Sequence, residues 1–279
     1  MPELPEVETV RRGLQRLLKG ELIKGVDVRE TRLRYPVDAR RLRRELPGRR
    51  VKGLGRRAKY LLIRLEEDGS REEAFLVIHL GMSGRIYFSE PGETPQSHTH
   101  VIFSISGDRE LHFRDPRRFG MVDLIPAALL DEDKRFSNLG VEPLSDECSA
   151  EYFFERSRKL RQPVKNFLMD GRRVVGVGNI YASEALFLAG VHPQRAAGRV
   201  SLKSWGRITA VVKEVLTEAI RQGGTTLKDF QGPDGTAGYF QVLLRVYGRG
   251  GEECLECSSI IRRKVLSGRS TFYCPRCQR

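Results

Sequence analysis

The chain has 279 residues, of which 39% are hydrophobic, so it can bury the core of one large domain or of two medium domains. Its 49 Lys and Arg residues exceed its 36 Asp and Glu residues, and the formal charge of +13 indicates a polyanionic partner, nucleic acid before membrane. The sequence contains neither an apolar run of the roughly 18 residues that a membrane helix needs nor a signal peptide. These features exclude a membrane protein, and we expect a soluble, cytoplasmic one.

The first segment predicts an amphipathic helix that begins near Pro5, because proline is favoured at the first helical position. Acidic residues lie early in this segment, basic residues lie late, and Gly20 can end the helix. Apolar residues recur at three- and four-residue spacing and predict one buried face: Val7, Val10, Leu14, Leu17 and Leu18.

The residues before this helix suggest covalent chemistry. Removal of Met1 would leave Pro2 as a terminal secondary amine, and terminal amines have a pKa of roughly 8, against about 10.4 for lysine. Uncharged amines attack carbonyl-like carbons and form Schiff bases. Glu3 places a carboxyl beside the amine for proton transfer, and Glu6 adds a second one in the first helical turn. The same residues also suit the plain start of a helix, so the pattern alone leaves both interpretations open.

Strand-like stretches follow and predict a mostly antiparallel β-sandwich packed with the first helix. Gly107-Asp108 is a hairpin signal between two of these stretches. Residues 81–84 form a tight loop between two others. The expected strand-forming runs are 22–30, 51–65, 74–80, 86–88, 100–106, 110–113 and 121–125.

The second half of the chain is predicted to be helical. Helices are expected at 150–161, from Pro163, at 180–189 and at 202–222, the last capped by Ser201. The fold class is therefore α+β. We expect an N-terminal domain at 1–125, an acidic linker at 126–148, a helical domain at 149–245 and a terminal metal module at 246–279.

Four cysteines near the end have the spacing of a zinc site: Cys254, Cys257, Cys274 and Cys277. Two thiolate pairs separated by sixteen residues suit one structural Zn²⁺, because four cysteines leave no open position on the metal. Between the pairs, residues 260–261 can pair with 271–273 across a turn at 267–269. Such a hairpin would hold Arg269 toward DNA phosphates, although a solvated turn residue is the plain alternative.

Several stretches together resemble the bacterial formamidopyrimidine-DNA glycosylase family: residues 1–9, 115–120, 178–182 and the last 30 or so. The likeness spans the whole chain and is looser only at Glu253 and Ser258, where Pro and Gly are usual. It implies a helix–two-turn–helix domain and a zinc finger after the sandwich. It also implies a monomeric glycosylase and abasic-site lyase, which excises 8-oxoguanine and formamidopyrimidines from double-stranded DNA and cleaves abasic sites. The expected route is a Schiff base on Pro2 followed by β,δ-elimination.

The resemblance also assigns phosphate contacts. Residues 39–64 carry eleven Lys and Arg against one acid, and Lys59 matches a family lysine that contacts phosphate beside the damaged nucleotide. Asn179, after the glycines at 176 and 178, matches a residue on a flanking phosphate. A lysine on a basic strand and a simple glycine turn are the plain alternatives.

An enzyme that works on a base inside a duplex must extrude that base and fill the gap. By resemblance Met82, Arg117 and Phe119 fill it, as apolar wedges and an arginine can. An ordinary core position would also suit Met82.

Three further assignments complete the expected site. The glycine-rich loop at 223–239 would fold over the everted base and present Thr225 and Thr226. His98 and Lys165 are expected to contact DNA, although the five histidines also suit structural roles.

Two other functions remain open at this stage. An oxidised-pyrimidine glycosylase of the endonuclease VIII type shares the architecture, but Leu4 and Phe119 favour the purine branch. A non-catalytic zinc-finger DNA-binding protein would explain the charge and the cysteines but not the N-terminus.

Overall fold

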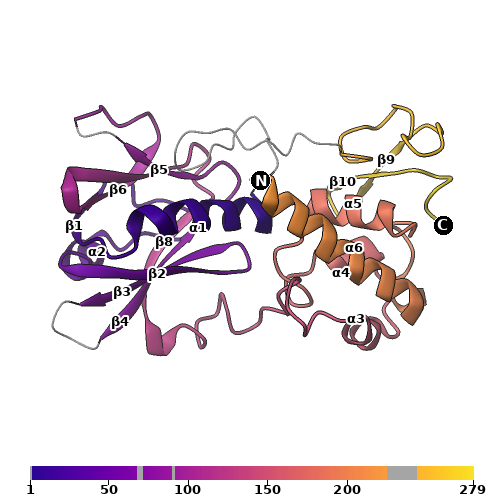
Figure 1. The fold of residues 1–279 in the computed structure, drawn as a ribbon, viewed down its shortest axis with the longest axis horizontal. Helices are drawn as coiled ribbons and strands as arrows, with labels where there is room; N and C mark the ends of the chain where they lie inside the picture. The colour runs from indigo at the N-terminus through magenta and orange to yellow at the C-terminus, as the bar shows by residue number, and fades with distance from the viewer. Residues whose placement is uncertain (1, 68–71, 90–91, 225–243) are drawn as a thin grey trace. The chain divides into compact units, whose positions relative to one another are not determined.

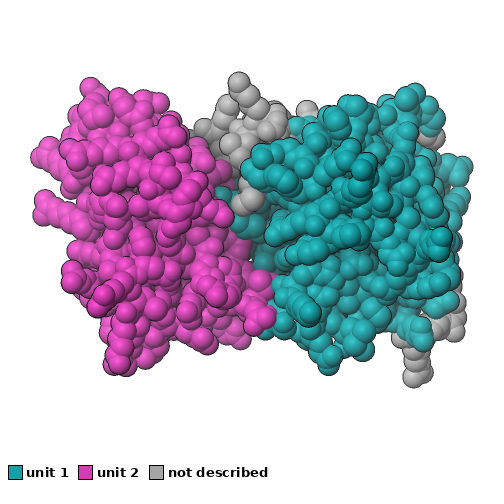
Figure 2. Space-filling view, turned by 180° about the vertical axis from the view of Figure 1, so that it is seen from behind, with its two compact units in different colours: residues 1–137, 223–239 teal, residues 138–222, 240–279 magenta. Residues whose placement is uncertain are grey.

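The computed structural model describes residues 2–67, 72–89, 92–224 and 244–279. The chain divides into two compact units, 1–137 with 223–239 and 138–222 with 240–279 (Figure 2). Each unit has its own hydrophobic core. Among the helices in the described ranges, none combines the length and apolar character needed to span a bilayer.

The first helix, α1 (Leu4–Leu18), is confirmed and begins one residue before Pro5. Its N-cap is Glu3, and Lys19 and Gly20 end it, the latter with a φ of +89° that glycine tolerates. The predicted apolar face is buried at Val7, Val10, Leu14 and Leu18. Leu17 was wrongly included in that face, because it is 38% exposed on the outer side of the helix.

The predicted antiparallel sandwich is confirmed in the first unit (Figure 1). Its described strands form two four-stranded sheets, in the orders β1-β6-β7-β5 and β2-β3-β4-β8. Apolar residues of both sheets and of α1 share one core, and α1 lies against β2 and β3. The strands are β1 (Ile23–Val28), β2 (Arg49–Arg57), β3 (Tyr60–Glu67), β4 (Glu73–His79), β5 (Arg85–Ser89), β6 (Thr99–Ile105), β7 (Arg109–Arg114) and β8 (Met121–Pro126).

Two features of this unit differ from the sequence prediction. The run at 51–65 is a hairpin rather than one strand, and its tight turn is Ala58-Lys59 between the paired residues Arg57 and Tyr60. Ala58 has a φ of +55°, a conformation for which the sequence offers no glycine or asparagine signal. A short helix, α2 (Ala39–Glu45), was missed; Asp38 caps it and only Leu42 is buried.

The second unit contains four α-helices in its described part: α3 (Ala150–Ser157), α4 (Val164–Leu168), α5 (Asn179–Leu188) and α6 (Leu202–Arg221). Trp205 packs between Phe153 and Phe167, with ring centroids 5.2 Å away in both cases. The prediction that the first of these helices reaches residue 161 was wrong. It ends at Ser157, whose hydroxyl accepts a hydrogen bond from the Trp205 indole, and Lys159 has a φ of +60°. Short 3₁₀ turns lie at Ser106–Asp108 and Ala127–Leu129 in the first unit and at Ala197–Arg199 in the second.

The terminal hairpin consists of β9 (Arg262–Leu266) and β10 (Arg269–Tyr273). The expected pairing of 260–261 with 271–273 was wrong, because Arg262 pairs with Tyr273 and the register follows from there. Ser267 and Gly268 form a two-residue turn with φ values of +47° and +74°. Such a turn leads directly into both strands, so Arg269 begins β10 instead of lying within the turn.

Candidate active site and nucleic-acid interface

The N-terminal end of α1 brings Pro2 and two buried carboxyls together. Pro2 is half-buried, whereas Glu3 and Glu6 are each 2% exposed. Glu6 Oε2 accepts a hydrogen bond from the Glu3 backbone N–H at 2.7 Å, as in a capping box. The positive end of a 15-residue helix dipole therefore lies beside Pro2, where it favours carboxylates and disfavours a protonated amine.

Gly224 also lies against the N-terminal end of α1, next to Glu6. A Cβ atom added to it would be 3.1 Å from Glu6 Cγ, and its φ of +84° disfavours any other residue. The segment that follows includes Thr225 and Thr226, which lie outside the described residues.

Lys59 lies in the turn of the β2–β3 hairpin, where it is half-buried and follows the buried residue Ala58. Its positive charge reaches His79 on the neighbouring strand β4. Burial, with the charges of Arg34 and Lys59, lowers the pKa of His79 to about 4. The neutral ring accepts a hydrogen bond through Nδ1 from the Gly81 N–H at 2.9 Å, so Lys59 and the Met82 loop are adjacent.

The structure brings the three predicted void-filling residues into two touching loops. Met82 is 36% exposed and Phe119 45% exposed, so both large apolar side chains are accessible for insertion into a duplex. The Arg117 guanidinium lies 4.9 Å from the centroid of the Phe119 ring. Gly81 packs so closely on Phe119 that an added Cβ would lie 2.4 Å from its carbonyl carbon.

A buried carboxylate that the sequence analysis did not single out joins these loops. Asp115 is fully buried; its Oδ1 accepts from the Ser83 hydroxyl at 2.6 Å and its Oδ2 from the Gly120 N–H at 2.7 Å. Ser83 Oγ in turn accepts from the Arg117 N–H at 3.2 Å. The exposed residue His98 lies nearby and accepts the Asp115 N–H through its carbonyl. In the sequence, this role was indicated by the position of Asp115 within a run of basic residues.

In the second unit, Asn179 is the first residue of α5 and is held from two sides. Its Oδ1 accepts from Lys165 Nζ at 2.6 Å, and its Nδ2 donates to the Ser270 carbonyl at 3.0 Å. Lys165 Nζ also donates to Thr271 Oγ1 at 2.8 Å. Lys165 is 1% exposed, so it supports Asn179 and β10 from within the protein and does not present its charge to solvent. Arg269 is exposed at the start of β10.

The four cysteines of the terminal module form a metal site. Their Sγ atoms all lie within 4.8 Å of one another, with Cys254–Cys277 at 3.9 Å and Cys257–Cys274 at 3.5 Å. A tetrahedral Zn²⁺ with bonds of about 2.3 Å requires sulfur–sulfur distances of about 3.8 Å, so the donor set fits zinc. The site holds one structural Zn²⁺.

Glu184 of α5 anchors this module to the helices, a role that the sequence did not reveal. Its carboxylate accepts the backbone N–H groups of Arg245, Val246 and Tyr247 at 2.8–3.1 Å. Burial raises the pKa of Glu184 despite these donors. The chain leading into the zinc finger is thus fixed to the same helix that begins with Asn179.

Comparisons with known proteins agree with this geometry along the whole chain. Residues 1–122 match the family model of the formamidopyrimidine-DNA glycosylase N-terminal domain, and residues 139–231 match that of the formamidopyrimidine-DNA glycosylase H2TH domain. Residues 251–279 match the zinc finger found in FPG and IleRS. The chain belongs to the formamidopyrimidine-DNA glycosylase family. The expected family and α+β fold are therefore confirmed.

Individual relatives are similar over their full length. The formamidopyrimidine-DNA glycosylases of Hahella chejuensis and Teredinibacter turnerae are 49% and 47% identical, with 100% of each chain covered. The crystal structure of MutM (Fpg) from Thermus thermophilus is 38% identical, with a TM-score of 0.87 over 99% of this chain and 98% of that one. A complex of Lactococcus lactis Fpg with abasic-site DNA is 32% identical, with a TM-score of 0.90 over 99% of both chains.

Proposed function

We propose that this protein excises oxidised purines from double-stranded DNA and then cleaves the strand as an abasic-site lyase, in base excision repair. The proposal rests on one observation: at the N-terminal end of α1, Pro2 precedes two buried carboxyls, Glu3 and Glu6. Full-length likeness to formamidopyrimidine-DNA glycosylases supports it. So do the Lactococcus lactis Fpg structures with N7-benzyl-Fapy-dG and abasic-site DNA.

In the proposed reaction the Pro2 amine attacks C1′ of the damaged nucleotide. The C1′–N bond to proline forms while the glycosidic bond breaks, and the base leaves with the bonding electrons and takes up a proton. Glu3 donates a proton to the opening sugar ring, for which a buried carboxyl next to the amine is suited. Because Pro2 is a secondary amine, it gives up its own proton after attack, to the departing base, and ring opening leaves a cationic iminium without an N–H. This iminium withdraws electrons, so that the C2′ proton is lost and the 3′ phosphate departs. A second elimination releases the 5′ phosphate.

The remaining residues bind and deform the duplex in this proposal. Lys59, Asn179 and Arg269 contact backbone phosphates, and Asn179 depends on Lys165 for its orientation. Met82, Arg117 and Phe119 fill the space that the everted base leaves. Zn²⁺ holds the β9–β10 hairpin, which is too small to fold around a hydrophobic core of its own.

We further propose the domain boundaries and roles expected from the sequence. These are a catalytic domain at 1–125, a linker at 126–148, a DNA-binding helical domain at 149–245 and a zinc finger at 246–279. We also propose that the protein works as a monomer on the nucleoid in the cytoplasm; the charge of +13 supports binding to DNA, and the relatives are bacterial.

Reductive trapping tests the proposal. The protein is incubated with a duplex containing 8-oxoguanine in the presence of borohydride, which reduces a Schiff base to a stable amine. We expect a covalent protein–DNA adduct with the lesion duplex and none with an undamaged duplex of the same sequence. A Pro2→Gly variant that cleaves DNA as well as the unaltered protein would contradict the proposed nucleophile. Faster excision of thymine glycol than of 8-oxoguanine would favour the endonuclease VIII type instead.

A further inference from the structure

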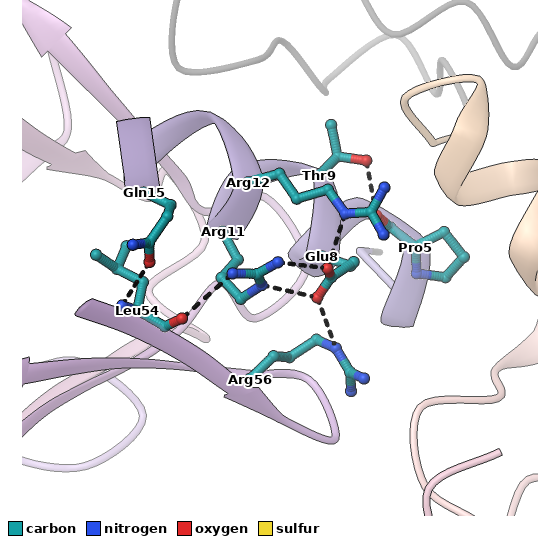
Figure 3. A network of polar contacts seen from close by, with 8 residues as sticks. All are labelled: Pro5, Glu8, Thr9, Arg11, Arg12, Gln15, Leu54 and Arg56. Atoms are coloured by element: carbon teal, nitrogen blue, oxygen red, sulfur yellow. Dashed lines mark hydrogen bonds and ion pairs between the residues drawn. The ribbon is translucent and has the colours of Figure 1, made fainter. Parts of the chain in front are cut away.

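Helix α1 and strand β2 each end at a residue of the proposed reaction. Pro2 and Glu3 precede α1, and Lys59 follows β2 across the Ala58 turn. A network of polar side chains joins the two elements (Figure 3). Its helix residues follow Pro2 along α1, and its strand residues, Leu54 and Arg56, belong to β2.

Glu8 is the centre of this network. Its side chain is 12% exposed and accepts hydrogen bonds from three arginines. Arg11 donates to both carboxylate oxygens at 2.8 and 3.0 Å, and Arg12 donates to Oε1 at 2.9 Å. These two lie on α1 itself. Arg56 donates from β2 to Oε2 at 3.3 Å (Figure 3), and this bond ties Glu8 to the strand.

The other end of Arg56 reaches the turn that carries Lys59. Arg56 Nη1 donates to the carbonyl of Ala58 at 2.8 Å. Ala58 has a φ of +55°, a conformation that costs an alanine energy and needs support from its surroundings. Arg56 thus connects the carboxylate on the first helix to the backbone of the residue before Lys59.

Two further contacts hold the helix against the same strand. β2 is the outer strand of its sheet, so some of its backbone groups lack a strand partner. The Leu54 N–H donates to Gln15 Oε1 at 2.7 Å, and the Leu54 carbonyl accepts from Arg11 at 3.2 Å. Side chains of α1 therefore complete the edge of β2 and fix how the helix lies along it.

Glu8 stays charged at neutral pH in this setting. Burial alone would raise its pKa, but the hydrogen bonds of Arg11 and Arg12 and the charges of Arg11 and Arg56 hold the pKa below its usual 4.5. A charged carboxylate between guanidinium groups makes stronger hydrogen bonds than a neutral one. At neutral pH the hydrogen bond between Glu8 on α1 and Arg56 on β2 is therefore one between two charged groups.

We propose that Glu8 and Arg56 are positioning residues that fix the proline nucleophile and the Lys59 turn relative to each other. This inference rests on the roles proposed above for Pro2 and Lys59. Small displacements of a nucleophile reduce rates strongly, by about 100-fold for 1 Å. Loss of the Glu8–Arg56 contact should therefore slow bond formation at the sugar while leaving the phosphate-binding residues of the second unit unchanged.

Four variants test this: two that weaken the link, one matched control and one conservative replacement. Glu8→Gln and Arg56→Gln each weaken the link, and Arg12→Gln is the matched control, because Arg12 also binds Glu8 but is 57% exposed and does not contact β2. The single-turnover rate of borohydride trapping is measured with an abasic-site duplex. Affinity is measured separately with a duplex whose abasic-site analogue cannot react. Thermal unfolding of each variant sets a temperature at which all are folded.

We expect Glu8→Gln and Arg56→Gln to trap DNA at least about tenfold more slowly, with a smaller loss of affinity that reflects the displaced Lys59, and Arg12→Gln to match the unaltered protein in both measurements. Arg56→Lys, which keeps the charge but loses the fork of donors, should recover part of the rate. Unaltered trapping in folded Glu8→Gln and Arg56→Gln would overturn the inference, as would an equal loss in Arg12→Gln. An unaltered protein that forms no adduct would instead refute the proposed function.

Discussion

The buried carboxylate of Asp115 gives a graded prediction for the two loops that carry Met82 and Phe119. Asp115→Ala removes both acceptors and leaves the Gly120 N–H buried without its partner. Each of the two charged hydrogen bonds is worth about 1.5–3 kcal/mol, so the free energy of unfolding should fall by about 3–6 kcal/mol. Asp115→Asn keeps an oxygen for Gly120, and its amide can donate to Ser83 Oγ. The expected loss is then about 1–2 kcal/mol.

Urea denaturation of the variants measures these differences, with Ser83→Ala as the variant that removes only one of the two bonds. The same proteins are assayed on a lesion in a closed duplex and on the lesion in a bubble that is already open. Asp115→Ala should be slower on the duplex, because the loops that fill the gap are no longer held together. If the Asn and Ala variants lose the same stability, the assignment of two separate hydrogen bonds is wrong.

Three more results follow from the structure. Phe119→Ala should slow cleavage in a closed duplex more than at a pre-opened site, and equal losses in the two substrates would argue against a wedge. His79 has a pKa of about 4 in the fold and 6.5 when unfolded, so the unfolded chain binds the extra proton between these values. Acidification through that window should therefore cost up to about 3 kcal/mol of stability, a dependence that His79→Gln should flatten in urea titrations at several pH values. Removal of Zn²⁺ by a chelator should abolish DNA binding while the circular dichroism of the β-sandwich persists; retained binding would show that the hairpin folds without metal.

Features with local signals were predicted from the sequence. The first helix is specified by its proline, its early acids and its apolar spacing, and the zinc site by two cysteine pairs. The alternation of strands and turns was enough to indicate an antiparallel sandwich. Each helix, strand or cysteine signal lies within a short stretch of the chain, where the spacing of the residues directly reflects the local backbone geometry.

Features that depend on distant partners could not be predicted. The hairpin at Ala58 was missed because its turn has a non-glycine residue at positive φ, which only its tertiary contacts stabilise. Lys165 had no signal for burial, since the oxygens that satisfy it belong to Asn179 and to Thr271, which is 106 positions away. The role of Asp115 likewise depends on Ser83, 32 positions earlier.

The identity of the nucleophile is tested most directly by locating the trapped adduct. The borohydride-reduced complex with an abasic-site duplex is digested with protease and nuclease, and the modified peptide is sequenced by mass spectrometry. We expect the sugar remnant on the nitrogen of Pro2, and we expect Met1 to be absent from the peptide. A remnant on Lys59 or another lysine, or an active protein that retains Met1, would contradict it.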